Sequence, residues 1–121
     1  MKIKHFALVG SDYRKLRDYY QDLLNLKLDF DDEENEYCQY SLESDLKIDF
    51  ESQKAVNNEL PDLGFEAKLL VRIEVDDVDK AYEKLGGRSD ILSKPVDRAW
   101  GMRNFYLVDP EKNIVEVYQK L

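Results

Sequence analysis

KLLVRIEVDDVDKAYEKLGG, residues 68–87, places a strand pattern directly before a helix pattern. Its first eight residues are mostly aliphatic or β-branched, which favours a strand. Asp76 or Asp77 suits the N-cap of the helix that follows, and Gly86 or Gly87 suits its end. Three more strands are expected around residues 91–96, 102–108 and 113–118, the last two joined by an Asp-Pro turn. This half of the chain is therefore predicted to be a βαβββ module.

The first half of the chain has the same order. Residues 2–9 alternate like a strand, and apolar residues at helical spacing over 11–24 predict a helix capped by Ser11 or Asp12. Strands are expected at 27–32, 36–43 and 45–51. We therefore predict an α+β chain that forms one domain, with module one at about 1–52, a polar linker at about 53–66 and module two at about 67–121.

The composition of the 121 residues narrows the function classes. No apolar run approaches the roughly 20 residues of a membrane helix, and a net charge of -8 opposes a large phosphate-binding surface. Neither a membrane nor a nucleic acid is therefore an expected partner. Cys38, the single cysteine, cannot form an internal disulfide, which favours a cytoplasmic location. The acidic run at 29–36 lacks the spacing of a calcium loop and is expected to be a solvated hairpin turn.

Strand alternation places several polar residues on one face of each predicted sheet. When the two helix starts are aligned, His5 pairs with Leu70, and both lie with Arg72 on the face away from the helices. The last strand of each module puts Asp49 and Glu116 on that face as well. A buried carboxylate needs a partner, so Glu116 is expected to contact a metal, His5 or Arg72.

Three stretches resemble the glyoxalase, bleomycin-resistance and extradiol-dioxygenase superfamily, also called vicinal oxygen chelate proteins. They are KHFALVGSD at residues 4–12, IEVDDVDKAYEKL at 73–85 and WGMRNFYLVDPEKNIVEVY at 100–118. The resemblance spans nearly the whole chain. It implies a glyoxalase-like fold, in which two βαβββ modules form a curled mixed sheet around a cleft, with the helices outside.

The resemblance also implies four metal-ligand positions, which fall on His5, Asp49, Leu70 and Glu116. Imidazole and carboxylates bind Ni, Zn, Mn or Fe and leave positions open for substrate oxygens. Leu70 stands where metalloenzymes of the superfamily carry a His, and it cannot coordinate an ion. The metal hypothesis therefore rests on His5, Asp49 and Glu116, with Glu116 also the candidate catalytic residue, and no tightly held metal is expected. An ordinary hydrogen-bonded histidine is the alternative for His5.

Arg72 places a cation at an apolar cleft position of the superfamily, beside the candidate metal face. One interpretation is an anchor for a ligand carboxylate or phosphate, which a guanidinium binds with two parallel hydrogen bonds. The other is a structural salt bridge to Glu116, Asp49 or Glu74.

Four further residues are candidate ligand contacts. Asn104 and Tyr106 alternate onto the same face as Glu116, and Tyr106 matches a substrate-contacting position of the fosfomycin-resistance enzymes of the superfamily. Trp100 and Arg103 flank Gly101 in a segment that the resemblance places at the cleft rim, where an indole can stack on a planar ligand. The alternative for Trp100 and Tyr106 is simple packing.

Three functions follow from these residues. The first is a metal-free protein that binds a small anionic or polar organic molecule in its cleft. The second is a metal-dependent lyase, isomerase or thiol transferase of glyoxalase type using His5, Asp49 and Glu116. The third is an interaction or regulatory protein with a vestigial cleft. The resemblance also predicts a homodimer, because family members of this length usually complete their sites by pairing chains.

Overall fold

The computed structural model describes all 121 residues. In chain order the elements are β1 (Lys2–Gly10), α1 (Tyr13–Leu24), β2 (Lys27–Asp32), β3 (Tyr37–Ser41), β4 (Lys47–Ser52), α2 (Gln53–Glu59), β5 (Leu69–Glu74), α3 (Val78–Lys84), β6 (Val96–Arg98), β7 (Met102–Val108) and β8 (Ile114–Lys120). The predicted α+β architecture with two βαβββ modules is present. None of the three helices is long and apolar enough to cross a membrane.

The chain divides into two compact units. The N-terminal unit is His5–Leu70, and the C-terminal unit is Val71–Leu121 together with Met1–Lys4. In the N-terminal unit the strands lie in the order β2-β3-β4-β1, with β1 parallel to β4 and the other pairs antiparallel. In the C-terminal unit the order is β5-β8-β7-β6, with β7 antiparallel to both β8 and β6. The two units thus repeat one arrangement of strands.

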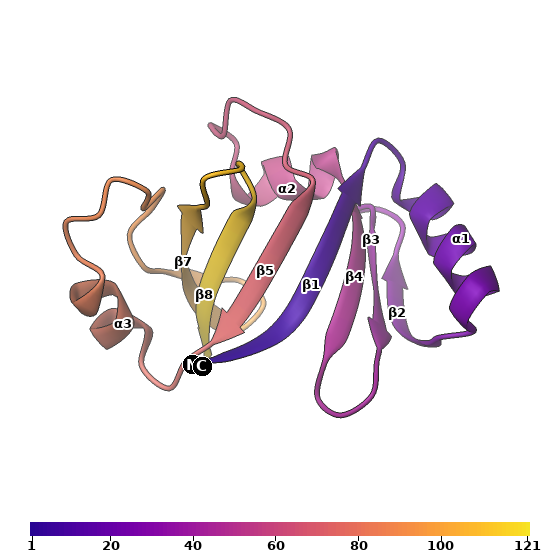
Figure 1. Ribbon diagram of the computed structural model, residues 1–121, viewed down its shortest axis with the longest axis horizontal. Helices are drawn as coiled ribbons and strands as arrows, with labels where there is room; N and C mark the ends of the chain where they lie inside the picture. Colours follow the sequence, from indigo (N-terminus) through magenta and orange to yellow (C-terminus); the bar gives the residue numbers. More distant parts are fainter. The chain divides into compact units, whose positions relative to one another are not determined.

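Helix α1 packs against β3 and β4 in the N-terminal unit (Figure 1). Tyr13 of the helix, Cys38 and Tyr40 of β3, and Phe50 of β4 form a buried core. The ring of Tyr20 stacks on Phe50 with centroids 5.0 Å apart. Helical spacing in α1 and alternation in the strands therefore direct apolar side chains to a common interior.

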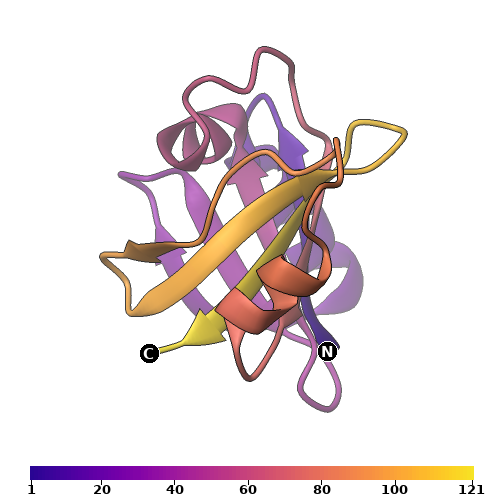
Figure 2. The same cartoon turned by 90° about the vertical axis from the view of Figure 1, so that its left-hand side faces the viewer.

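Helix α3 covers one face of β7 and β8 in the C-terminal unit (Figure 2). The core on this face contains Val78 of the helix, Phe105 and Leu107 of β7, and Val117 of β8. Since side chains alternate along a strand, the residues between these positions point to the opposite face of the sheet. That opposite face carries the polar residues discussed below.

Asp12 and Asp77, two of the predicted N-cap residues, cap the N-termini of α1 and α3. Asp12 accepts a hydrogen bond from the Arg14 N–H, and Asp77 accepts one from the Lys80 N–H. Helix α3 ends at Lys84, and Gly87 follows with a φ of 83°, a conformation in which glycine has no steric penalty.

Two segments differ from the sequence prediction. The polar linker contains the short helix α2, in which Val56 is the buried residue. Seven residues with one buried apolar position are too short to give a recognisable helical period. The strand expected around 91–96 is interrupted: Ile91 forms an isolated bridge with Leu107, and β6 begins only at Val96. Pro95, which has no N–H to donate, lies just before it.

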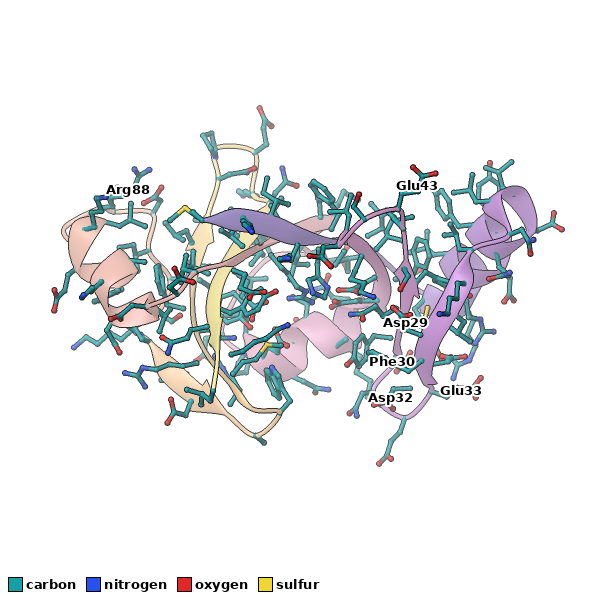
Figure 3. The ribbon with its side chains drawn as sticks, turned by 90° about the horizontal axis from the view of Figure 1, so that it is seen from below. Asp29, Phe30, Asp32, Glu33, Glu43 and Arg88 are labelled. Atoms are coloured by element: carbon teal, nitrogen blue, oxygen red, sulfur yellow. The ribbon has the colours of Figure 1, made fainter.

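The acidic run at 29–36 forms the end of β2 and the turn into β3, as predicted. Figure 3 shows Asp29, Phe30, Asp32 and Glu33 along this hairpin. Asp32 accepts hydrogen bonds from the backbone N–H and the side-chain amide of Asn35, 3.1 and 2.8 Å long. The carboxylate thus stabilises the turn itself.

Candidate functional site

Glu116 lies almost fully buried on β8, 3% exposed, on the sheet face opposite α3. Its two carboxylate oxygens accept from two different donors. Arg72 Nη1 on β5 lies 3.1 Å from Oε1, and Asn104 Nδ2 on β7 lies 2.5 Å from Oε2. A salt bridge of Arg72 to Glu116, Asp49 or Glu74 was predicted, and the one to Glu116 is confirmed. Both oxygens of this buried carboxylate are satisfied, and its charge is neutralised by Arg72.

The register of β7 and β8 places Asn104 and Tyr106 beside Glu116. Tyr106 lies directly opposite Glu116, and Asn104 lies two residues from Tyr106 on the same face. Phe105 and Leu107, which alternate with them, pack under α3 instead. The Asn104 amide also lies 3.2 Å from the Tyr106 hydroxyl and donates to it. Asn104 and Tyr106 are both fully buried.

Arg98 joins this group and was not identified from the sequence. It is the last residue of β6 and pairs with Met102 across the β6–β7 hairpin, so it shares the face of Asn104 and Tyr106. Its Nε donates to Asn104 Oδ1 over 2.9 Å. Its guanidinium carbon lies 5.6 Å from the ring centroid of Tyr106. The hairpin register around Gly101 is the sequence signal that could have revealed it.

We define the Glu116 cluster as Arg72, Arg98, Asn104, Tyr106 and Glu116. Its members come from β5, β6, β7 and β8, so each of these four strands supplies at least one.

Tyr118 makes a neighbouring contact on β8: its hydroxyl lies 3.2 Å from Glu74 Oε2. Burial, followed by the nearby Glu74 carboxylate, raises the pKa of Tyr118 well above its usual range. Tyr118 therefore stays protonated and donates at neutral pH.

Trp100 and Arg103, the two predicted rim residues, lie outside the Glu116 cluster. Trp100 is 51% exposed, and the Arg98 guanidinium carbon lies 5.9 Å from its ring centroid. Arg103 is not part of the cluster, because its guanidinium contacts Asp79 at 3.1 Å and Asp97 at 3.0 Å. Hydrogen bonds first to Asp79 and then to Asp97 raise the pKa of Arg103.

His5 and Asp49 come together in the N-terminal unit. His5 Nδ1 on β1 lies 3.4 Å from Asp49 Oδ2 on β4 and 3.3 Å from the side-chain nitrogen of Gln39 on β3. The Asp49 side chain is 3% exposed and that of His5 17%. Leu70, the fourth position implied by the resemblance, is fully buried.

A glyoxalase-like domain model matches residues 3–121 of the chain. A Bacillus subtilis (strain 168) relative, the uncharacterized protein YraH, is 32% identical over 129 aligned positions that cover all of both chains. The chain belongs to the glyoxalase-like domain family. It is thereby a member of the glyoxalase, bleomycin-resistance and dioxygenase superfamily.

Solved structures of the superfamily share the fold of this glyoxalase-like chain. A glyoxalase/bleomycin resistance protein/dioxygenase superfamily member from Vibrio splendidus 12B01 superposes with a TM-score of 0.73 at 12% identity, covering 95% of this chain and 96% of its own. The methylmalonyl-CoA epimerase of Streptomyces coelicolor, solved with 2-nitronate-propionyl-CoA, gives a TM-score of 0.69 at 15% identity, covering 99% and 94%. At these identities the likeness concerns the fold.

The side chains at the implied metal positions fit a divalent ion poorly. Leu70 offers no donor atom, and the two oxygens of Glu116 are held by Arg72 and Asn104. A cation would have to displace Arg72 or share the carboxylate with it, which like charges disfavour. No group of three His, Cys, Asp or Glu side chains forms a ligand set. The Glu116 cluster is instead suited to hydrogen-bonding a polar molecule.

Proposed function

We propose that this glyoxalase-like protein binds a small polar organic molecule at the Glu116 cluster and performs no metal-dependent chemistry there. The observation that carries the proposal is the buried Glu116 carboxylate, held at once by Arg72 and Asn104. Burying an ion pair is a weak way to stabilise a fold compared with apolar packing, so its presence on a sheet face favours a role in recognition.

The cluster offers both hydrogen-bond donors and an aromatic surface. Arg98 and Arg72 supply N–H groups, and Tyr106 supplies a ring and a hydroxyl. Because these groups bind one another, they are held in place before a ligand arrives, which reduces the ordering cost of binding. The Streptomyces epimerase structure contains an organic ligand on the same fold, which supports the class of ligand proposed here.

Ligand-observed NMR with a library of small polar organic molecules tests this function. We expect members that bind the wild type and lose binding in Glu116→Gln, because the neutral amide releases Arg72 and rearranges the cluster. Glu43→Gln is the matched control, since Glu43 is an exposed residue of the N-terminal unit (Figure 3). A library without binders, or binders indifferent to Glu116→Gln, would contradict the proposal.

The proposal includes a cytoplasmic homodimer. The free, buried Cys38 is compatible with a reducing compartment. Tyr19 and Leu23 on α1 are 63% and 62% exposed, and large exposed apolar side chains favour association. Light scattering is expected to give the mass of two chains; the mass of one chain would contradict the dimer.

A further inference from the structure

We infer that Arg98 is an anion anchor, which binds the carboxylate or phosphate group of the organic molecule taken by the Glu116 cluster. The inference rests on the proposed function and specifies the chemical class of its ligand. Arg98, rather than Arg72 as the sequence suggested, is then the residue that binds the anionic group of the ligand.

Arg98 differs from every other arginine in its lack of an acidic partner. The chain has six arginines, at positions 14, 17, 72, 88, 98 and 103. Five of them have a carboxylate within 4.0 Å. Arg98 has none, although the chain carries a net charge of -8 and Asp97 is its neighbour in sequence. Asp97 lies instead 3.0 Å from Arg103.

The guanidinium of Arg98 is held in place by neutral groups. Its Nε donates to Asn104 Oδ1 over 2.9 Å, and its carbon lies near the rings of Tyr106 and Trp100, at 5.6 and 5.9 Å. These contacts orient the group without cancelling its charge. Its two terminal nitrogens make no hydrogen bond, so they remain as a pair of donors for an anion.

The electrostatics of the cluster favour an anion at this point. The charge of Glu116 is matched by that of Arg72 at 3.1 Å, so the positive charge of Arg98 is in excess. The half-buried position of Arg98 weakens solvent screening compared with a fully exposed side chain. A planar carboxylate can accept two parallel hydrogen bonds from a guanidinium.

The hairpin that carries Arg98 also supplies an aromatic surface for the rest of the ligand. Gly101 closes the turn between Arg98 and Met102 with a φ of 83°, in a conformation that glycine adopts without strain. Trp100, in the same turn, is 51% exposed. An anion with a planar organic body could therefore contact the indole while its charged end meets Arg98.

Benzoate and phenyl phosphate are suitable probes, with benzamide as a neutral molecule of nearly the same shape as benzoate. Trp100 is the only tryptophan, so its indole N–H gives one unambiguous signal in ¹H–¹⁵N NMR, and the Gly101 amide gives a second. We expect benzoate or phenyl phosphate to shift both signals at millimolar concentration, with benzamide binding more weakly. The two anions show whether a carboxylate or a phosphate is preferred.

Three variants separate the anchor from general charge effects. Arg98→Gln should weaken binding of the anion by roughly tenfold to a hundredfold, the range for a lost charge-assisted hydrogen bond. Arg98→Lys keeps the charge but loses the planar fork, so it should retain part of the affinity. Arg88→Gln is the charge-matched control: Arg88 lies near the end of α3 (Figure 3) and is paired with Asp90 at 2.8 Å.

Equal anion affinity in Arg98→Gln, Arg88→Gln and the wild type would overturn the inference. So would benzamide binding as tightly as benzoate, or no response of the wild type to either anion. If neutral polar molecules still bind in the library experiment and lose affinity in Glu116→Gln, the proposed function survives while the anchor fails. Circular dichroism of each variant verifies that the fold is retained.

Discussion

The two units bury a carboxylate at the same place in the same arrangement of strands, yet its surroundings differ. Asp49 on β4 has the imidazole of His5 at 3.4 Å, whereas Glu116 on β8 has the guanidinium of Arg72 at 3.1 Å. Ala7, opposite Asp49 on β1, is the residue that aligns with Arg72. The strand pattern therefore fixes where a carboxylate is buried, and the two carboxylates have different basic groups beside them, an imidazole and a guanidinium.

This difference assigns separate chemistry to the two units. The pair of His5 and Asp49 joins an imidazole, which can donate or accept a hydrogen bond, to a carboxylate that only accepts. In the pair of Arg72 and Glu116 the guanidinium is a permanent cation, and Glu116 accepts a further hydrogen bond from Asn104. Recognition of a polar ligand fits the second group better, because its donors are fixed in charge and position.

The largest effect is expected from removing Arg72, the guanidinium that lies beside Glu116. Arg72→Leu leaves Glu116 buried without its cation, and the free energy of unfolding should fall by about 3–5 kcal/mol, as for other broken buried pairs. Urea denaturation measures the loss. Adding Glu116→Gln to Arg72→Leu should recover part of it, because the remaining group is uncharged. An Arg72→Leu variant as stable as the wild type would contradict a stabilising role of the ion pair with Glu116.

A second prediction tests whether Leu70 is the reason why no tightly bound metal is expected. Leu70→His should raise the affinity for Ni or Zn by at least about tenfold, in line with what single groups at metal sites contribute. Calorimetric titration measures it, and Leu69→His, on the adjacent residue of β5, is the control. The gain should disappear when His5→Ala is added, and it should weaken in acid, since imidazole must be neutral to bind.

Submicromolar affinity in the wild type would contradict this prediction. If that affinity were lost in His5→Ala, the metal-dependent lyase, isomerase or transferase hypothesis would replace the metal-free one. No gain in Leu70→His would mean that the ion pair of Arg72 and Glu116, rather than Leu70, prevents tight metal binding.

Most of the fold could be predicted because each module begins with strand-like alternation of apolar residues, followed by apolar residues at helical spacing. Alternation in residues 2–9 and helical spacing over 11–24 identify β1 and α1, and the same change of period identifies β5 and α3. The same alternation placed Arg72 and Glu116 on one face, and Glu116 was one of the three carboxylates predicted to lie within reach of Arg72. Helix α2 could not be predicted, since Val56 is its only buried residue.

The site was less predictable because it depends on cross-strand register. Arg98 and Arg103 both flank the turn at Gly101, and both are basic, so composition does not distinguish them. The pairing of Arg98 with Met102 sends Arg98 toward Asn104 and Arg103 toward Asp79. A shift of one residue in this hairpin would exchange their roles.

The smallest predicted effect concerns Asp29 on β2, a charged contact that belongs to the N-terminal unit alone. Asp29 accepts from the Ser41 hydroxyl at 2.7 Å and from Lys47 Nζ at 3.1 Å. Burial raises its pKa, but the hydrogen bonds from Ser41 and Lys47 outweigh this and hold it below the ordinary 3.8. The ionised carboxylate therefore favours the folded state above pH 3.8, and the contribution is lost as the pH falls through the lower folded-state pKa.

Asp29→Asn should consequently lower stability at pH 7 and flatten its decline between neutral and acidic pH. Urea denaturation at several pH values measures both, with Asp22→Asn, at an exposed position of α1, as the control. Identical pH profiles for the two variants would remove Asp29 as a difference between the units.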